Sequence, residues 1–421
     1  MRKPQEAEIM APVGSFESLS AAINAGADSV YFGVTQLNMR AKAAHNMTIS
    51  DLGEIACIAR KNDVKTYLVV NTLLYDHDVL VMRKIVDTAK ENDIDAIIAF
   101  DFACVNYCNE IKMPVHMSVQ FSISNYETVE FFSQFTNRVV LARELNLEQI
   151  KNIYNQIQKN NLLGNEGRIM EIETFAHGAL CVAQSGRCWM SVYTDNSSAN
   201  RGACRQNCRA KYKVTDVDTG NELVVDNQYI MSAADICTID FLDEVLDAGV
   251  QVLKIEGRGR SPEYVSTVVK TYKKALKDIE NGEYSREKID EYLKDLKKVF
   301  NRKLSHGNYY LGREIVEYSD VHGSKATHEK EFIGRVTHYY PKVNIAEIKV
   351  DTGLIKKGDQ VLFIGKTTGV LDGYVKELRV DGSVADEAIR GDVITFEVSD
   401  RVRINDKLYI IKKKERYQNE N

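Results

Sequence analysis

Residues 8–33 read EIMAPVGSFESLSAAINAGADSVYFG, and this stretch decides the fold class. It contains an apolar run, Glu8–Pro12, an amphipathic run, Phe16–Ala25, and a second apolar run, Ser29–Phe32. The middle run repeats its apolar residues at three- and four-residue spacing, which predicts a helix, and the short flanking runs predict buried strands. The stretch therefore predicts a strand–helix–strand unit of a parallel sheet.

The same alternation continues to about residue 260 and predicts six further strands. They are Lys65–Val70, Ala96–Phe100, Val115–Val119, Arg138–Leu141, Glu171–Phe175 and Val252–Ile255. Helical patterns such as Ile49–Lys61 and Val79–Asn92 lie between them. Eight strands close a (β/α) barrel, so we predict an α/β protein with a TIM-like barrel over residues 1–260. A doubly wound open sheet is the alternative.

The regularity breaks after the seventh strand, because roughly 75 residues separate it from the eighth. Insertions of this length are usually functional. We predict a cysteine-bearing insertion at residues 176–237 that includes a hairpin of Tyr212–Val217 and Glu222–Asp226.

Two segments follow the predicted barrel. Residues 261–328 contain two amphipathic helices rich in lysine and glutamate, Pro262–Asn281 and Ser285–Arg302, which we expect to flank the barrel. Residues 329–421 alternate short strands with turn signals such as Lys357-Gly358-Asp359. This pattern predicts a small closed C-terminal β-barrel.

Composition limits the classes of protein to which the chain can belong. The chain has 421 residues, of which 44% are apolar and 27% charged, as in an ordinary soluble protein. It has no apolar signal core at its N-terminus and no apolar run long enough to span a membrane, so we expect a cytoplasmic location and no membrane partner. A net charge of -5 excludes a globally basic nucleic-acid binder and leaves only local patches for nucleic acid.

Five of the eight cysteines lie in the insertion: Cys181, Cys188, Cys204, Cys208 and Cys237. Their spacing is C-x6-C-x15-C-x3-C-x28-C, whereas zinc sites prefer close pairs in each half-site. A 4Fe-4S cluster takes thiolates from several loops and tolerates irregular spacing. The pattern thus favours an iron–sulfur cluster over zinc.

Residues 197–213 contain no acidic residue but include Arg201, Arg205, Arg209, Lys211 and Lys213. These cations have two explanations. They compensate the negative charge of a buried cluster, or they bind nucleic-acid phosphates. Both explanations remain open at this point.

Longer motifs resemble a known family. They are HGALCVAQSGRCWMSVY at 177–193, NRGACRQNCR at 200–209, VVLAREL at 139–145 and KIEGRGRSPEYVSTVVKTY at 254–272. With them, residues 7–415 resemble the collagenase-like peptidase family 32 of unknown catalytic type, most closely its tRNA hydroxylation protein P branch. The resemblance implies a 4Fe-4S cluster and oxygen-independent hydroxylation with prephenate as co-substrate. For this branch it implies tRNA as partner and 5-hydroxyuridine at the wobble position as product. The C-terminal domain resembles domain 2 of translation factors.

The resemblance also implies a set of cluster ligands. In relatives, the matching positions are those of Cys181, Cys188, Cys204 and Cys237. One sister protein uses the pair that matches Cys204 and Cys208, so Cys208 is the alternative to Cys237.

Reactive groups of a (β/α) barrel lie at the carboxyl ends of its strands. The catalytic candidates there are His177, Arg143, Glu144 and Glu256. The candidates for substrate binding are Arg40, Asn71, Gln120, Arg187 and Arg258, together with Arg205 and Arg209 for RNA. Guanidinium groups suit the two carboxylates of prephenate, which favours Arg40, Arg143, Arg187 and Arg258. The structural alternatives are a rim salt bridge between Arg143 and Glu144 and a hydrogen-bonded core position for His177.

The main hypothesis is a prephenate-dependent tRNA uridine hydroxylase whose electron donor or protein partner the sequence does not identify. The alternatives are a collagenase-like protease, a hydroxylase of ribosomal RNA or of a quinone ring, and a non-catalytic RNA-binding partner. Neither G-x-S-x-G nor H-E-x-x-H occurs, which disfavours standard proteolytic chemistry. No G-x-G-x-x-G loop occurs either, so the oxidant or oxygen donor would come from outside.

Overall fold

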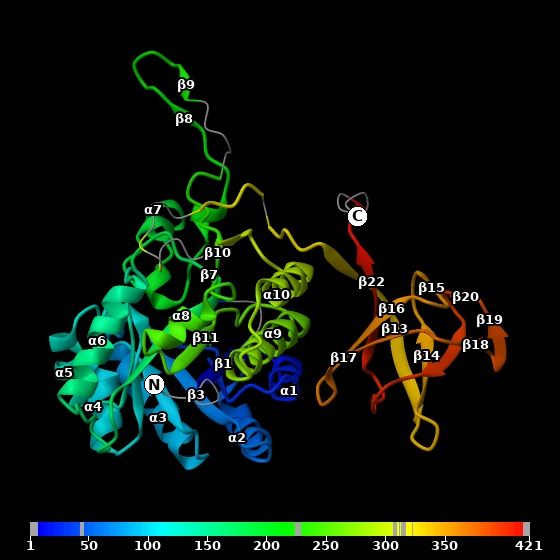
Figure 1. The fold of residues 1–421 in the computed structure, drawn as a ribbon, viewed down its shortest axis with the longest axis horizontal. Coiled ribbons are helices and arrows are strands. Elements are labelled where there is room, and N and C mark those ends of the chain that lie inside the picture. The colour runs from blue at the N-terminus through cyan, green and yellow to red at the C-terminus, as the bar shows by residue number, and fades with distance from the viewer. Residues whose placement is uncertain are drawn as a thin grey trace.

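The computed structural model describes residues 7–42, 46–223, 229–305, 310, 312, 317–321 and 323–415. An α/β body carries a protruding hairpin, and a β-rich domain lies at its side (Figure 1). In these ranges no helix combines the length and the apolar character needed to cross a membrane.

Eight parallel strands form a closed barrel. β11 (Val252–Ile255) closes the ring by pairing with both β1 (Glu8–Pro12) and β7 (Glu171–Ala179). The remaining strands are β2 (Ser29–Phe32), β3 (Lys65–Val70), β4 (Ala96–Ala99), β5 (Val115–Met117) and β6 (Arg138–Val140). The predicted TIM-like barrel is therefore confirmed, with each strand at its predicted place. The largest difference is β7, which continues past its predicted end at Phe175 to Ala179.

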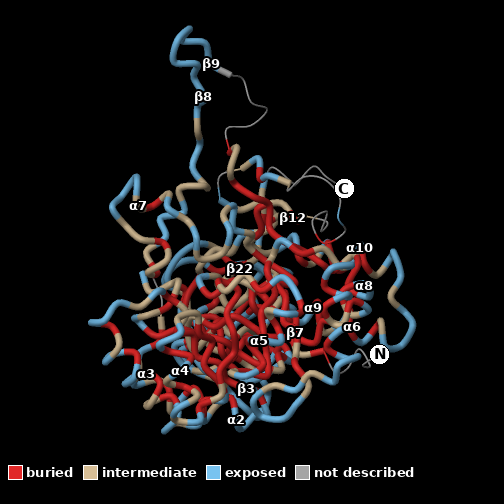
Figure 2. Tube along the Cα trace, turned by 90° about the vertical axis from the view of Figure 1, so that its left-hand side faces the viewer, coloured by how far each residue is buried: buried red, intermediate tan, exposed pale blue. Residues whose placement is uncertain are grey.

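Helices cover the outside of the barrel, and buried residues fill its interior (Figure 2). The helices are α1 (Phe16–Asn24), α2 (Leu52–Arg60), α3 (Val79–Glu91), α4 (Phe102–Glu110), α5 (Tyr126–Ser133), α6 (Leu147–Lys159), α8 (Leu242–Asp247), α9 (Pro262–Glu280) and α10 (Arg286–Lys298). Short polar side chains define where several helices begin, since they accept a hydrogen bond from a free backbone N–H. Ser15 Oγ accepts from Ser18 N at the start of α1, at 3.2 Å.

The insertion between β7 and β11 contains α7 (Met190–Asp195) and a hairpin of β8 (Val214–Thr215) and β9 (Glu222–Leu223). The hairpin stands away from the barrel, and the described side chains of its two strands are exposed (Figure 2). The predicted hairpin is thus confirmed as far as residue 223, and residues 224–226 lie outside the described residues.

The sequence did not predict β10 (Asp235–Cys237), which follows the hairpin. It pairs antiparallel with β7 and parallel with β12 (Leu304–Ser305). A strand of three residues is too short to show a hydrophobic period, so only its pairing with distant residues reveals it.

The C-terminal domain is built from antiparallel strands. Eight of them pair in the order β17-β16-β22-β13-β14-β21-β18-β19, and β15 pairs with β20. Their bounds are β13 (His328–Tyr340), β14 (Ile345–Val350), β15 (Leu354–Lys356), β16 (Gln360–Gly365), β17 (Gly369–Tyr374), β18 (Leu378–Val380), β19 (Ser383–Ala385), β20 (Glu387–Ile389), β21 (Val393–Glu397) and β22 (Lys407–Lys413). The strands enclose a core of their own, around Ile333, Phe363 and Phe396. The predicted domain is confirmed as antiparallel β structure, but its predicted closure into a barrel is not, because no pairing among the described strands joins β17 to β19.

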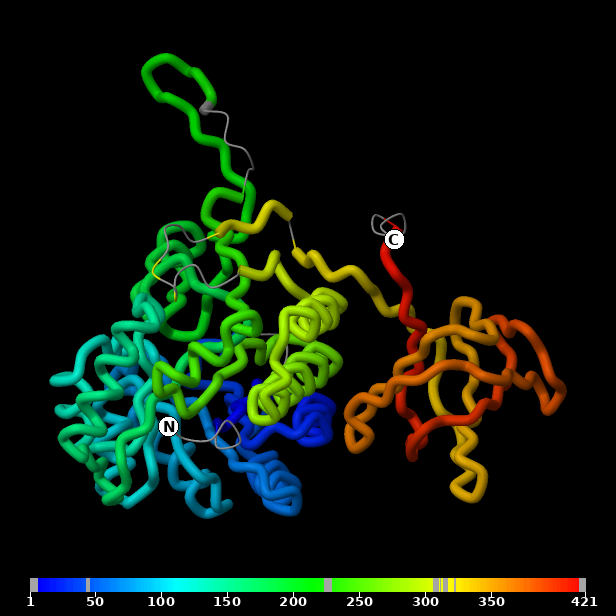
Figure 3. The backbone as a smooth tube through the Cα atoms, viewed as in Figure 1, coloured from blue at the N-terminus to red at the C-terminus, as the bar shows by residue number. Residues whose placement is uncertain are grey.

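The turn between β16 and β17 holds this domain against α1 of the barrel (Figure 3). Ser20 Oγ donates a hydrogen bond to Lys366 O at 2.7 Å. Gly369 has a φ of +66°, and a Cβ there would lie 2.7 Å from the backbone N of Ala21. Only glycine accommodates both the dihedral angle and the close approach.

Candidate active site at the carboxyl end of the barrel

A cavity of about 210 Å³ opens at the carboxyl ends of the barrel strands. Its walls come from residues that follow β2, β3, β5 and β11 and from the cysteine-bearing insertion. A single water molecule needs only about 10–15 Å³ of such a volume, so the cavity has room for a small organic molecule. Its position is the one at which barrel enzymes carry their active sites.

The lining of the cavity is cationic. Among its described residues seven are arginine or lysine, and one, Glu256, is acidic. The cations are Arg40, Arg143, Arg209, Lys254, Arg258, Arg260 and Arg302. This excess of positive charge favours an anionic ligand.

Glu256 and Arg40 form an ion pair in the cavity wall, with Arg40 Nη2 at 3.0 Å from Glu256 Oε1. Burial by itself would raise the pKa of Glu256, but Arg40, Arg260 and Arg143 outweigh it and hold this pKa at about 2. Glu256 is therefore a carboxylate at neutral pH and cannot serve as a proton donor. Its role is to orient Arg40.

Arg258 is held from behind the cavity wall. It is only 9% exposed, and its Nη1 donates a hydrogen bond to Asn38 Oδ1 at 3.1 Å. A Cβ at Gly33 would lie 2.3 Å from the same nitrogen, so the glycine makes room for the guanidinium. Burial lowers the pKa of Arg258 to about 10, which still leaves it charged at neutral pH.

Arg143 lies with its guanidinium carbon 3.9 Å from the ring centre of Phe175 and donates to Ala179 O at 3.2 Å. Its Nε is buried and has no hydrogen-bond partner. A buried donor without a partner costs about 1–3 kcal/mol. A carboxylate bound in the cavity would offset this cost.

Asn71 and Gln120 form the uncharged part of the wall. Asn71 Nδ2 donates to Gln120 Oε1 at 3.2 Å, and Gln120 Nε2 donates to the backbone O of Asn71 at 2.7 Å. Because the two amides hydrogen-bond to each other, they shape the cavity wall and offer no charge to a ligand.

Three of the predicted ligands, Cys181, Cys204 and Cys208, line the cavity. Burial raises the pKa of the Cys208 thiol, Arg209 lowers it, and Cys181, Cys204 and Cys188 raise it further. Cys181, Cys204 and Cys208 are therefore neighbours around the cavity, and Cys188 is near enough to Cys208 to affect this pKa. Within the described residues, however, no three His, Cys, Asp or Glu side chains converge in the way that a single metal ion requires.

Cys237 is placed elsewhere. It lies on β10 opposite His177 of β7, is 1% exposed, and is not among the described residues that line the cavity. Burial raises the pKa of its thiol to about 12, and its side chain contacts Tyr272. The geometry groups Cys208, and not Cys237, with the other three predicted ligands.

Several other predicted residues also lie away from the cavity lining as far as it is described. His177 is 2% exposed, its Nδ1 lies 3.5 Å from Tyr272 Oη, and burial lowers its pKa to about 3. It is therefore a core residue, and we assign it no catalytic role. Glu144 and Arg187 are exposed outside the lining, and no rim salt bridge between Arg143 and Glu144 occurs among the described ion pairs.

The cations of residues 197–213 divide into internal and exposed ones. Arg209 Nη2 donates to Leu180 O at 2.6 Å, and Arg201 Nη1 lies 2.5 Å from Asp78 Oδ2. Arg209 therefore holds the insertion together, and Arg201 ties it to the barrel. Arg205 and Lys211 are exposed.

Sequence reasoning missed four titratable residues of the described cavity lining: Tyr31, Lys254, Arg260 and Arg302. Arg260 carried a signal, because it follows β11 two residues after Arg258. Lys254 carried one as well, since a lysine inside a buried strand is unusual. Arg302 had none, because it reaches the cavity from beyond α10.

Residues 14–318 match the sequence model of Peptidase family U32. A protein of Porphyromonas gingivalis W83 named "Collagenase" is 48% identical over 97% of this chain and 98% of its own length. An "Uncharacterized protease" of Methanocaldococcus jannaschii is 37% identical over 96% and 98%. The "tRNA hydroxylation protein P1" of Bacillus subtilis is 30% identical over 85% and 83%.

These likenesses correct one expectation and confirm another. The tRNA hydroxylation branch was expected to be the most similar, but the relative named collagenase shares more identical residues, 48% against 30%. The expected family is the one matched, over most of the chain. The chain belongs to peptidase family U32.

Proposed function

We propose that this protein is an iron–sulfur enzyme that hydroxylates the wobble uridine of tRNA to 5-hydroxyuridine, with prephenate as co-substrate. The observation that carries the proposal is the gathering of four thiols beside a cation-lined cavity at the carboxyl end of the barrel. Two relatives named for tRNA hydroxylation, 30% and 28% identical, support the choice of substrate.

Cys181, Cys188, Cys204 and Cys208 are the cluster ligands in this proposal. A 4Fe-4S cluster takes four cysteines and tolerates irregular spacing, so the C-x6-C-x15-C-x3-C spacing of these four residues suits it better than a tetrahedral zinc ion. When bound, the cluster supplies electron transfer. Arg209, beside Cys208, stabilises the negative charge of the thiolates.

The cavity binds the co-substrate through its cations. Arg143 and Arg258 present guanidinium groups that can pair with the two carboxylates of prephenate. Arg40 is partly neutralised by Glu256, so it contributes less net charge than the other two. The wall of Asn71 and Gln120 faces the uncharged part of the ligand.

The surface beside the cysteines suits RNA. Trp189 and Tyr193, four residues apart on and before α7, are 62% and 86% exposed. Arg187 and Arg205 are exposed on the same insertion. Exposed aromatic rings stack on unpaired bases, and neighbouring cations bind the phosphates, which is the combination typical of single-stranded RNA recognition.

A collagenase-like protease is the second candidate, and the name of the 48% identical relative favours it over the hydroxylase. The cavity offers little to support it. Ser185 lines the cavity, but none of the described lining residues is a histidine that could activate it.

The test is a comparison in a strain that lacks this protein. We expect its tRNA to lack wobble 5-hydroxyuridine by nucleoside mass spectrometry, and the wild-type gene to restore it. Protein purified without oxygen is expected to contain about four irons per chain. Cys188→Ser should abolish both results, while Cys57→Ser, on the exposed face of α2, should keep both.

Other outcomes identify the alternatives. Cleavage of gelatin that disappears in Ser185→Ala, with normal nucleosides in the deletion strain, would establish the protease. Loss of a hydroxylated base from ribosomal RNA, or loss of a hydroxylated quinone, would show that this other molecule is the substrate and not tRNA. If the nucleosides are unchanged while the protein binds both a cluster and tRNA, the result would identify a non-catalytic RNA-binding protein.

A further inference from the structure

Lys254 occupies an unusual position inside the barrel. Its Nζ lies 2.7 Å from Glu173 Oε1, and the two side chains are only 7% and 0% exposed. The ring centres of Tyr31 and Phe175 lie 4.5 Å and 5.6 Å from the same nitrogen. Lys254 nevertheless lines the cavity, so its amine is sheltered from bulk water but open to a ligand.

The surroundings of Lys254 favour a reactive amine. Burial lowers the pKa of Lys254, Glu173 opposes this shift, and Arg258 and Arg138 add to it. Desolvation and neighbouring cations are the two means by which proteins make a lysine nucleophilic. Glu173 Oε2 is buried without a hydrogen-bond partner, so the carboxylate has capacity to accept a proton.

A purely structural role explains Lys254 less well. Barrel interiors are normally filled with branched apolar side chains, and a buried ion pair is weak evidence for stability. Here the lysine also adds a seventh cation to a lining that already holds six arginines. The pair with Glu173 offsets part of the repulsion among these cations, but it does not explain why a lysine rather than an apolar side chain stands inside the barrel.

We propose that the cavity is a site for 2-oxo acids in which the amine of Lys254 forms an imine with the ketone carbon of the ligand. The ammonium first gives a proton to Glu173, and the free amine then adds to the carbonyl carbon. The carbonyl oxygen leaves as one water, for which Glu173 returns a proton, so the step is a condensation without oxidation or reduction. Arg143 and Arg258 hold the carboxylate during the addition.

This inference deepens the proposed function, because prephenate is itself a 2-oxo acid, but it does not depend on RNA. Imine formation fixes the ligand in one orientation and withdraws electrons from the carbon atoms next to the imine. Lys254 thereby becomes a catalytic residue, whereas a structural lysine would form no covalent adduct.

The experiment traps the imine. The purified holoprotein is incubated with phenylpyruvate and sodium cyanoborohydride and examined by mass spectrometry. We expect one adduct per chain, located in a tryptic peptide of residues 214–258. No lysine or arginine lies between Lys213 and Lys254, and trypsin does not cleave after a modified lysine. Lys270→Arg, on the outer face of α9, is the matched control and should give the same adduct.

Two variants distinguish chemistry from folding. Lys254→Arg keeps a cation beside Glu173 and should form no adduct. Glu173→Gln keeps the lysine and should slow trapping by at least about tenfold, with unchanged circular dichroism. No adduct in the wild type, or the same adduct in Lys254→Arg, would overturn the inference.

Different results decide the inference and the proposed function. Trapping at Lys254 in a protein whose deletion leaves all RNA nucleosides normal supports the 2-oxo acid site and overturns the hydroxylase. Wobble hydroxylation that persists in Lys254→Arg, with no adduct in the wild type, does the reverse.

Discussion

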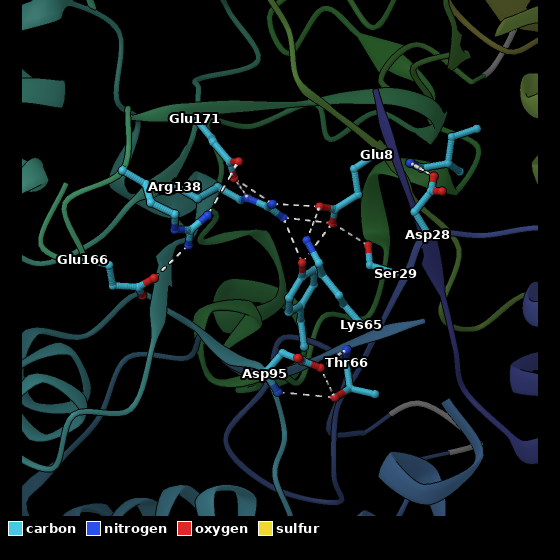
Figure 4. Close-up of polar contacts among 12 residues, drawn as sticks. Glu8, Asp28, Ser29, Lys65, Thr66, Asp95, Arg138, Glu166 and Glu171 are labelled. Atoms are coloured by element: carbon cyan, nitrogen blue, oxygen red, sulfur yellow. Dashed lines mark hydrogen bonds and ion pairs between the residues drawn. The ribbon is translucent and has the colours of Figure 1, made fainter. Parts of the chain in front are cut away.

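The two ends of the barrel differ in how their charges are satisfied. At the amino end, Arg138 is 3% exposed and donates to both carboxylate oxygens of Glu8, at 2.9 and 2.8 Å, and to Glu171 at 2.8 Å (Figure 4). Ser29, Lys65 and Tyr67 also contact the carboxylate of Glu8. At the carboxyl end, seven cations and one acid line the cavity, Glu173 and Asp235 outside the lining pair with Lys254 and Arg302, and the Nε of Arg143 has no partner.

The difference separates a structural network from a binding site. In the amino-end network, Glu8 lies within ion-pair distance of Arg138 and Lys65, and Glu171 within that of Arg138, so a ligand would gain little there. The carboxyl end keeps positive charge and thiols that only an added group can satisfy. Substitutions at the amino end should therefore affect stability, and those at the carboxyl end should affect cofactor and ligand.

The largest effect is expected at the carboxyl end. Cys204→Ser should remove all bound iron and all hydroxylation, because a 4Fe-4S cluster needs four thiolates. Iron analysis and absorption spectra of anaerobically prepared protein would check this result. The free energy of unfolding of the iron-free chain should stay nearly unchanged, and a full complement of iron in the variant would contradict the ligand assignment.

At the amino end, Arg138→Met should lower the free energy of unfolding by about 3–5 kcal/mol, because it leaves Glu8 and Glu171 buried without their cation. Urea unfolding measures the change. Arg60→Met is the matched control, since Arg60 pairs with Asp93 at a site where its side chain is 61% exposed, and it should cost about 0–1 kcal/mol. Equal losses of unfolding free energy in the two variants would contradict the distinction between the buried network and an exposed ion pair.

The amino-end network also predicts a pH dependence. Burial would raise the pKa of Glu8, but Arg138 outweighs it and lowers this pKa from 4.5 to about 2. Because the folded pKa is the lower one, this stabilisation is complete above pH 4.5 and is lost as the pH falls towards 2. Glu8→Gln should therefore flatten the acid side of the stability curve. Glu256 titrates in the same window, so part of the slope should remain.

A smaller effect is expected on the surface of the insertion. Reversing the charge of Arg187 and Arg205 should weaken tRNA binding several-fold and lower the salt slope by about one for each lost cation. Reversing Lys294 and Lys298 on α10 is the control and should change binding less. Equal weakening from both pairs would mean that the exposed arginines have no special role.

The smallest effect is expected for Cys237→Ser. Its thiol is buried on β10 beside Tyr272 and is not among the described residues that line the cavity, so iron content should not change. Iron analysis beside Cys208→Ser, which should lose the cluster, decides between the two candidates. Loss of iron from Cys237→Ser alone would restore the ligand set that the relatives implied.

Local patterns predicted most of the barrel because each strand and helix shows its own hydrophobic period. Lys65–Val70 and Val252–Ile255 were predicted with the bounds that the structure gives them. The rule that reactive groups follow barrel strands also placed Asn71, Arg143 and Arg258 in the cavity before their contacts were known. It failed for His177, because β7 continues past its predicted end and carries that residue into the core.

The sequence by itself determined the closed barrel, the cysteine-bearing insertion and the β-rich C-terminal domain, since these depend on periodicity and spacing along the chain. Only the tertiary structure decided which thiols are neighbours and which cations reach the cavity. The pairing of β10 with β7 places Cys237 opposite His177 and not among the described residues that line the cavity, and Arg302 reaches the cavity from beyond α10. Contacts between residues so far apart in the chain depend on strand pairing and packing, which leave no local trace in the sequence.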